Sequence, residues 1–223
     1  MFKHELFERF ELPSETINDC RYYTTPTGEK YPSVTTVIGK YSDKRGLYEW
    51  RKRVGEAEAN RISAFASSRG TRVHNILEKY VLGDPTYLEG VMPTNSVMFD
   101  GMRRILDENV DEIYGIEHPL YSHKLRTAGK TDLIARFNGI KSIVDYKTSS
   151  REKREEHILG YFLQSTCYAM MASERTGVPI PQIAILIGVD GDLPQLFVKK
   201  TVDYVPAVLK MFKNHKIETL YKK

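Results

Sequence analysis

Two aspartates and a lysine lie close together in the middle of the sequence, on either side of a turn. Asp132 belongs to residues 129–134, and Asp145 and Lys147 belong to residues 142–148. Alternate residues of a strand point to the same face, so Asp145 and Lys147 project together if this stretch is extended. Two carboxylates beside an ammonium group suit a hard cation such as Mg²⁺ or Mn²⁺, which binds oxygen ligands and retains water for hydrolysis.

A cross-strand salt bridge is the simpler interpretation of these residues, because exposed ion pairs are common and stabilise little. The apolar residues Ile143 and Val144 lead directly into Asp145, which places its carboxylate at the buried end of a strand. A buried carboxylate needs a partner or a metal ion. The sequence context therefore weakens the salt-bridge interpretation, and both interpretations stay open at this point.

Four short motifs follow one another between residues 70 and 168. In chain order they are Gly70-x-x-x-His74, Gly129-x-x-Asp132, Asp145-x-Lys147 and Gln164-x-x-x-Tyr168. Each motif alone is a weak signal, but the four in this order resemble the PD-(D/E)XK nuclease superfamily, and within it the RecB-like exonucleases. Residues 31–35 also resemble a segment of the mitochondrial genome maintenance exonuclease and related phage enzymes.

The resemblance implies a metal site built from several parts of the chain. Asp132 and Asp145 would bind Mg²⁺ or Mn²⁺. A ring nitrogen of His74 and the backbone carbonyl of Tyr146 would complete the protein ligands, although a lone helical histidine is more often structural. Glu117 would be a further acidic member, because the superfamily sometimes uses an additional glutamate.

The resemblance also implies a catalytic set and a DNA-binding set. The catalytic set is Asp132, Asp145, Lys147, Gln164 and Tyr168. Lys147 would hold or deprotonate the attacking water and offset the charge that grows on the phosphate. The DNA-binding set is Thr148, Ser33, Thr35 and Arg72. Glu78, one turn beyond His74, is an open candidate for the acceptor of the second imidazole nitrogen.

Composition limits the cofactors and partners. The 223 residues carry 33 Lys and Arg against 29 Asp and Glu, a net charge of +4 that permits a nucleic-acid partner without requiring one. Two cysteines are too few for a four-cysteine iron–sulfur cluster, and the sequence has no Gly-x-x-x-x-Gly-Lys-Ser/Thr loop for ATP. We find neither a membrane-length apolar run nor a leader, so we expect no membrane partner and a cytoplasmic location in a bacterial or phage-infected cell.

Periodicity predicts one α/β domain. Helical spacing covers residues 47–82, with a boundary at Gly70 and a second helix capped by Thr71. The other expected elements are helices over residues 96–109, 155–175 and 205–221, and strands over residues 112–122, 129–138, 141–147, 182–189 and 195–200. Asn138-Gly139 predicts a hairpin turn. Residues 33–38 fit either a strand or a short helix capped by Ser33.

This order favours a mixed central sheet flanked by helices, and the resemblance implies a restriction-endonuclease-like core with an N-terminal helical cover. Residues 1–45 form an extension, whose aromatic residues would either grip a single strand or belong to the core. Residues 46–110 form the helical cover that carries His74, and residues 111–223 form the catalytic α/β core.

The resulting hypothesis is a metal-dependent DNA exonuclease that acts on single-stranded ends or flaps and leaves a 5′-phosphate and a 3′-hydroxyl. The alternatives are a structure-specific endonuclease of the same superfamily and a non-catalytic nucleic-acid-binding subunit. We expect a monomer whose partners are single-stranded DNA and proteins of replication or recombination.

Overall fold

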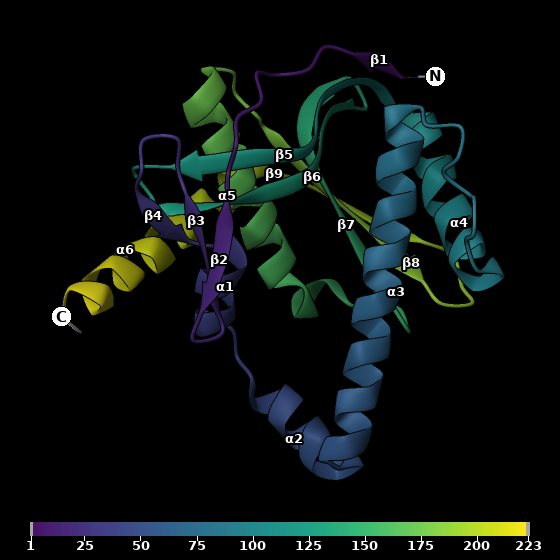
Figure 1. Cartoon of the computed structure of the whole chain (residues 1–223), viewed down its shortest axis with the longest axis horizontal. Helices are drawn as coiled ribbons and strands as arrows, with labels where there is room; N and C mark the ends of the chain where they lie inside the picture. Colours follow the sequence, from purple (N-terminus) through teal and green to yellow (C-terminus); the bar gives the residue numbers. More distant parts are fainter. Residues whose placement is uncertain (1, 222–223) are drawn as a thin grey trace.

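A six-stranded mixed sheet lies at the centre of the computed structural model, which describes residues 2–221 (Figure 1). In spatial order its strands are β1 (Lys3–His4), β5 (Val110–Ser122), β6 (Thr127–Phe137), β7 (Ile140–Ser149), β8 (Gln182–Val189) and β9 (Gln195–Lys200). The pairs β1–β5 and β7–β8 are parallel, and the other neighbours are antiparallel. The predicted α/β class with a mixed sheet is confirmed; residues 1 and 222–223 lie outside the described part.

The β6–β7 hairpin forms where the Asn-Gly signal predicts it. Asn138 and Gly139 have φ angles of 51° and 76°, the left-handed conformation that a tight two-residue turn requires. Phe137 pairs with Ile140 next to the turn, and the ladder continues to the pair Leu133–Val144. The hairpin thus fixes the register of β6 and β7, the two strands that carry Asp132 and Asp145.

Helices cover both faces of the sheet (Figure 1). One face carries α1 (Val34–Tyr41), α5 (Leu159–Thr176) and α6 (Val205–Tyr221), and the other carries α4 (Pro93–Asn109) and the C-terminal part of α3 (Glu56–Leu82). Single-turn helices η1 (Glu155–His157) and η2 (Thr201–Asp203) precede α5 and α6. Ile143 packs in the core under α1, α5 and α6, and Val144 packs in the core under α3 and α4, because successive residues of a strand point to opposite faces.

The predicted helix boundary at Gly70 is wrong. Helix α3 runs without interruption from Glu56 to Leu82, and Gly70 lies in its interior. The break comes at Gly55, whose φ of 85° ends α2 (Arg45–Val54) and turns the chain into α3. The last turn of α2 is basic and the first turn of α3 is acidic, which is the charge pattern that favours a helix boundary at Gly55.

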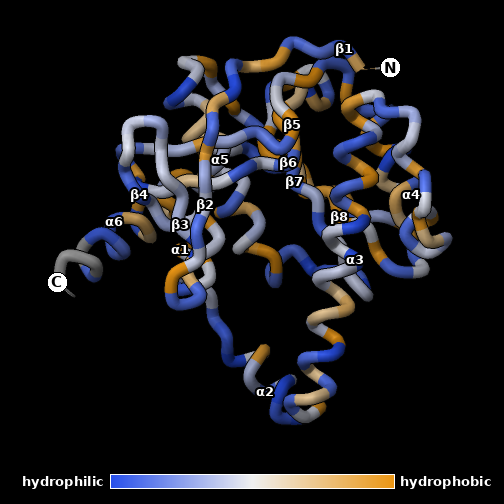
Figure 2. The backbone as a smooth tube through the Cα atoms, in the orientation of Figure 1, coloured by the Kyte–Doolittle hydropathy of each residue, from blue (hydrophilic) through white to orange (hydrophobic). Residues whose placement is uncertain are grey.

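Helix α2 and the N-terminal half of α3 project from the body as an arm, defined here as residues 45–68 (Figure 1). Helix α2 buries none of its residues, and hydrophilic and hydrophobic positions alternate along the arm (Figure 2). The predicted cover over residues 46–110 is therefore only partly a cover, because α4 and the rest of α3 pack on the sheet and the arm does not. None of the helices in residues 2–221 has the length and apolar character that a membrane crossing demands.

The N-terminal extension forms a three-stranded antiparallel sheet of β2 (Ser14–Ile17), β3 (Cys20–Thr24) and β4 (Lys30–Pro32). Tyr23 and Tyr31 are buried there against Tyr121 and Ala128 of the β5–β6 hairpin, so these two rings belong to the core. The open choice at residues 33–38 resolves as a helix, because the Ser33 side chain accepts a hydrogen bond from the Thr36 N–H and caps α1.

Candidate active site

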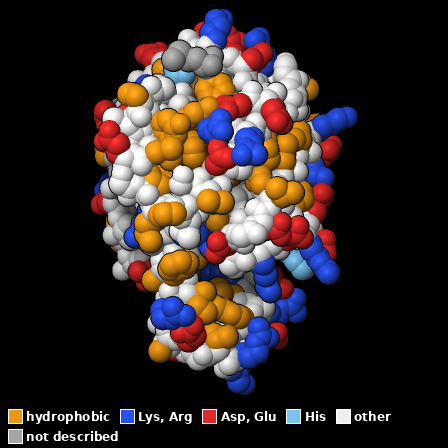
Figure 3. Space-filling view, turned by 90° about the vertical axis from the view of Figure 1, so that its right-hand side faces the viewer, with side chains coloured by type: hydrophobic (Ala, Val, Ile, Leu, Met, Phe, Trp, Pro, Cys, Tyr) orange, Lys and Arg blue, Asp and Glu red, His pale blue; other side chains and the backbone are white. Residues whose placement is uncertain are grey.

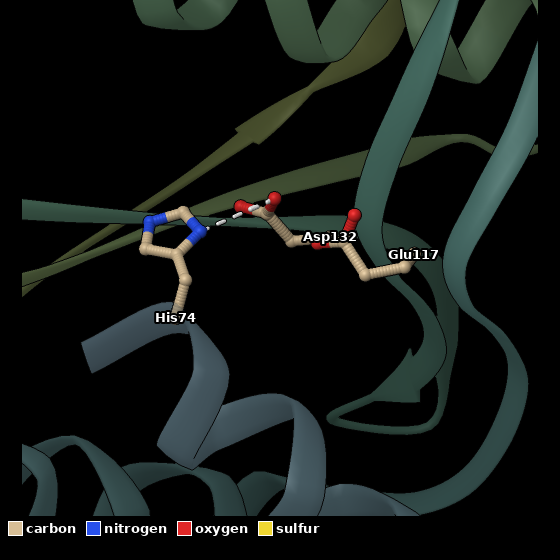
Figure 4. A group of neighbouring side chains, drawn as sticks. All are labelled: His74, Glu117 and Asp132. Carbon is tan, nitrogen blue, oxygen red and sulfur yellow. Dashed lines mark ion pairs between the residues drawn. The ribbon is translucent and has the colours of Figure 1, made fainter. Parts of the chain in front are cut away.

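Three of the predicted side chains meet at one point beside the sheet (Figure 4). His74 comes from α3, Glu117 from β5 and Asp132 from β6. Each offers a ligand atom, and these atoms all lie within 4.8 Å of one another. His74 Nδ1 lies 3.5 Å from Asp132 Oδ1, and both side chains are largely withdrawn from solvent. This group has the donor types and the size of a site for one cation.

Glu117 reaches the group through an unusual backbone conformation. Its φ of 43° lies in the left-handed region, which residues other than glycine and asparagine adopt infrequently. Its neighbours Ile116 and His118 pair with Leu133 and Thr131, so Glu117 lies opposite Asp132. A strained residue held in the middle of a ladder is typical of functional sites, where it re-aims a side chain.

Asp132 is held by the adjacent strand. Its Oδ2 accepts a hydrogen bond of 2.7 Å from the backbone N–H of Tyr146. This contact lies just beyond Leu133–Val144, where the β6–β7 ladder ends. The N–H and C=O of one strand residue point toward the same neighbouring strand, so the Tyr146 carbonyl also faces the gap between β6 and β7. The Tyr146 carbonyl therefore faces the side of Asp132, and its role as a metal ligand stays a prediction.

Asp145 and Lys147 form a second group next to the first. Lys147 Nζ makes an ion pair with Asp145 Oδ2, and the Gln164 side-chain amide of α5 donates to Asp145 Oδ1 at 3.0 Å. Asp145 is only 1% exposed, and the Lys147 side chain is 19% exposed. The predicted projection of Asp145 and Lys147 from one face of β7 is therefore observed, and their ion pair forms within the site.

The charges of the two groups influence one another. Burial raises the pKa of Glu117 to about 7, and the Asp132 carboxylate adds to the rise. Burial also raises the pKa of Asp145 to about 6, although the Lys147 ammonium opposes it. Burial lowers the pKa of His74, but the hydrogen bond and the charge of Asp132 outweigh it and leave that pKa raised. The raised pKa values of Glu117 and Asp145 show that their ionised forms lack sufficient nearby positive charge, and a bound cation would stabilise those forms.

The glycine and tyrosine of two separate motifs meet in the structure. A Cβ atom on Gly129 would lie 3.0 Å from the Tyr168 ring and 3.0 Å from its hydroxyl oxygen. Tyr168 is buried in the core on the α5 face of the sheet. A residue without a side chain at position 129 is therefore what allows α5 to pack this close to β6.

The other predicted site residues differ in their surroundings. Thr148 lies at the end of β7, and its Oγ1 would be 3.5 Å from a Cβ on Gly70. Ser33 is buried and caps α1, which leaves its hydroxyl engaged in the protein. Thr35 and Arg72 are exposed, and their predicted DNA contacts stay predictions. No hydrogen bond joins Glu78 to His74 in the described structure, so the suggested acceptor role of Glu78 is not observed.

The residues present fit a divalent cation. The Glu117 carboxylate makes no hydrogen bond or ion pair in the described part of the chain, whereas its backbone carbonyl accepts a hydrogen bond from Arg9. Two carboxylates and one imidazole suit Mg²⁺ or Mn²⁺, which prefer oxygen donors. A residue that the sequence motifs do not contain also belongs here: the ring of Tyr161, one turn before Gln164 on α5, lies beside Lys147 Nζ. The only sequence signal for Tyr161 is its position three residues before Gln164, on the same side of a helix.

Comparison with known proteins adds a family to this geometry. Residues 94–202 match the sequence profile of the PD-(D/E)XK nuclease superfamily, a range that includes both aspartates, Lys147 and the Gln-x-x-x-Tyr helix. No curated protein matches the chain. A crystal structure from Eubacterium rectale, named "Putative exonuclease", superposes with a TM-score of 0.49 at 15% identity, over 68% of this chain and 66% of that chain's length.

The profile match and the motif residues agree in position. The match contains Asp132, Asp145 and Lys147 on two adjacent strands of a mixed sheet, with Gln164 hydrogen-bonded to Asp145. Residues 94–202, just under half of the chain, therefore match the PD-(D/E)XK nuclease superfamily.

Proposed function

We propose that this protein is a metal-dependent DNA exonuclease that acts on single-stranded ends or flaps and leaves a 5′-phosphate and a 3′-hydroxyl. The observation that carries the proposal is the adjacency of two groups, a cation site of His74, Glu117 and Asp132 and an ammonium–carboxylate pair of Lys147 and Asp145. Phosphodiester hydrolysis needs a water aligned for attack and positive charge on the phosphate. A cation bound by the first group would supply the positive charge, and Lys147 of the second group would orient the water.

The cation site would consist of His74, Glu117 and Asp132, with Asp145 and the Tyr146 carbonyl beside them. The chemistry supplied by bound Mg²⁺ or Mn²⁺ is polarisation of the scissile phosphate. The Tyr146 N–H fixes one oxygen of Asp132, and Gln164 fixes one oxygen of Asp145. Both carboxylates are therefore oriented before substrate arrives, which limits the reorganisation that catalysis requires.

Lys147 would orient the attacking water and stabilise charge on the phosphate. Burial lowers the pKa of Lys147, but the charges of Asp145 and Asp132 outweigh it and leave that pKa raised. A protonated ammonium group donates hydrogen bonds to water and to phosphate oxygens. This charge state favours an electrostatic role for Lys147 over abstraction of a proton.

The arm supports the choice of single-stranded DNA. It carries Tyr48 and Phe65, which are 71% and 63% exposed, together with basic residues such as Lys52 and Arg53. Figure 3 shows apolar and basic side chains next to one another on the projecting lower lobe. Exposed rings stack on unpaired bases, and Lys and Arg contact the phosphates. A duplex, whose bases are already stacked, has less use for these rings.

Linear and circular single-stranded DNA of the same sequence test the exonuclease proposal. With Mg²⁺ or Mn²⁺, we expect the linear form to be degraded to short products and the circle to remain intact. Cleavage of the circle at a comparable rate would contradict the exonuclease proposal and support the structure-specific endonuclease. Binding of both forms without cleavage would support a non-catalytic subunit. Matched duplex and RNA substrates would establish the preference for DNA.

A further inference from the structure

An aromatic ring lies against the ammonium group of Lys147. The ring centroid of Tyr161 is 5.2 Å from Lys147 Nζ, within the range of a cation–π contact. Tyr161 is half-buried. Asp145 contacts the same ammonium group through an ion pair. Lys147 Nζ is therefore held by a carboxylate and by the face of a ring.

The topology explains why α5 supplies this ring. Helix α5 connects the parallel strands β7 and β8, so it runs antiparallel to β7. Gln164 contacts Asp145, and Tyr161, one turn earlier, contacts Lys147, two positions later on the strand. Residues three apart on a helix and two apart on a strand have comparable spacing, so the two elements present matched pairs.

We propose that Tyr161 is a positioning residue that holds the Lys147 ammonium group where it meets water and the substrate phosphate. The proposal rests on the proposed function, because it assigns Tyr161 a role in the same cleavage. It goes beyond the motif residues, of which Asp145 contacts the ammonium group from one side only. The contact uses the ring face, so the aromatic ring matters and the hydroxyl does not.

The chemistry of the two side chains supports this assignment. A lysine side chain has a flexible four-carbon stem and an ammonium group with three N–H donors. An aromatic face attracts the charge without offering a conventional acceptor atom, so the remaining donors stay available for water or phosphate. Small displacements of a catalytic group, about 1 Å, lower rates strongly. Loss of the ring would leave Asp145 as the only close partner of the ammonium group in the described site.

Steady-state cleavage of end-labelled single-stranded DNA with saturating Mn²⁺ tests the proposal in five proteins. These are the wild type and the variants Tyr161→Phe, Tyr161→Leu, Tyr204→Leu and Lys147→Ala. Tyr204 is the matched control, because it is another half-buried tyrosine, and it packs on Phe162 in the core. A melting temperature for each variant reports on folding. If Tyr161→Leu melts below the assay temperature, Tyr161→Gln replaces it with the same expectation.

We expect Tyr161→Leu to lower kcat about tenfold while KM changes less than about twofold. Tyr161→Phe retains at least about half of the wild-type kcat, since it retains the ring. Tyr204→Leu cleaves at the wild-type rate. A wild-type kcat in Tyr161→Leu, or an equal loss in Tyr161→Phe, would overturn the role of the Tyr161 ring.

The same set separates this proposal from the proposed function. Cleavage by the wild type and loss of cleavage in Lys147→Ala support the function, whatever Tyr161 does. Full activity in Lys147→Ala, or no cleavage by the wild type, would overturn both proposals together. Wild-type cleavage, loss in Lys147→Ala and an unaffected Tyr161→Leu would remove the Tyr161 proposal alone.

Discussion

The carboxylate of Asp132 accepts a hydrogen bond from the backbone N–H of Tyr146 on the neighbouring strand, at 2.7 Å. The backbone pairing of β6 with β7 ends at Leu133 and Val144, and beyond this pair the Asp132 side chain replaces a backbone carbonyl as the hydrogen-bond acceptor. The strands can separate at this point without leaving that N–H unsatisfied. The Tyr146 carbonyl faces the same space between the strands, beside the group of His74, Glu117 and Asp132 that would hold a cation.

Replacement of Glu117 should weaken the metal dependence more than the fold. In Glu117→Gln, the concentration of Mn²⁺ or Mg²⁺ that gives half-maximal cleavage should rise at least about tenfold, because one anionic donor is lost. His74→Ala should act in the same direction. Glu108→Gln is the control, because Glu108 is an exposed acid on α4 that contributes no ligand atom to the group. An unchanged metal titration in Glu117→Gln would remove Glu117 from the site.

Gly129→Ala should destabilise the protein. The added Cβ would lie 3.0 Å from the buried Tyr168 ring, which has core residues around it and little room to move. Overpacking of this kind lowers the free energy of unfolding by about 1–3 kcal/mol. The control is Gly39→Ala in α1, where a Cβ meets nothing within 4 Å and helix propensity should add up to about 1 kcal/mol. Thermal or urea unfolding measures both; equal stability of Gly129→Ala and the wild type would contradict this account of Gly129.

Glu112 should make the stability depend on pH in the acidic range. The hydrogen bond from Lys3, followed by that from the Tyr114 hydroxyl, lowers the pKa of Glu112 to about 2. The unfolded chain, with a glutamate pKa of about 4.3, takes up this proton first as the pH falls. The stabilising contribution of Glu112 is therefore complete above about pH 4.3 and is lost toward about pH 2.

Urea unfolding of the wild type and Glu112→Gln across this range tests the linkage. The difference in unfolding free energy between the two proteins should be largest near neutral pH and should shrink as the pH falls. A difference that is the same at every pH would show that the ionised carboxylate of Glu112 is not what stabilises the pairing of β1 with β5.

Removal of the exposed rings on the arm should weaken the binding of single-stranded DNA. Tyr48→Ala and Phe65→Ala should each reduce the affinity for a single-stranded oligonucleotide about tenfold, since stacking contributes about 1–3 kcal/mol per base. Affinity for a blunt duplex of the same length should change little. Leu209→Ala, which removes a half-exposed apolar side chain from α6, is the control. Equal losses for single- and double-stranded DNA, measured by fluorescence anisotropy, would contradict base stacking on the arm.

The strands and the hairpin could be predicted because their signals are local. Asn138-Gly139 encodes a turn through the φ angles that these residues tolerate, and the predicted strand over residues 182–189 coincides with β8. The boundary at Gly70 failed for a different reason. Its sequence resembles a helix stop, but packing against the sheet keeps α3 continuous, and no local pattern reports that packing.

The site could be predicted only where a motif contains its residues. Asp132, Asp145 and Lys147 follow from the spacing on two strands. The structure pairs Asp145 with Lys147 and groups Asp132 with His74 and Glu117, so Asp145 lies outside the group of three possible cation ligands. Glu117 approaches His74 with a left-handed backbone conformation in β5. A glutamate gives no sign of this conformation in the sequence, because left-handed positions are typical of glycine and asparagine. Tyr161 lies outside every motif, and its contact with Lys147 arises from the antiparallel passage of α5 over β7.

Cleavage of end-labelled linear single-stranded DNA, by the wild type and by Lys147→Ala, with Mg²⁺ or Mn²⁺ and after chelation, tests the central claim most directly. We expect the wild type to degrade the DNA only with a divalent cation. Lys147→Ala should bind the DNA with similar affinity and cleave it at least about 10²-fold more slowly, because a cation at the phosphate is lost. Cleavage by the wild type after the metal has been chelated would contradict the proposed mechanism. Cleavage by Lys147→Ala at the wild-type rate would also contradict it.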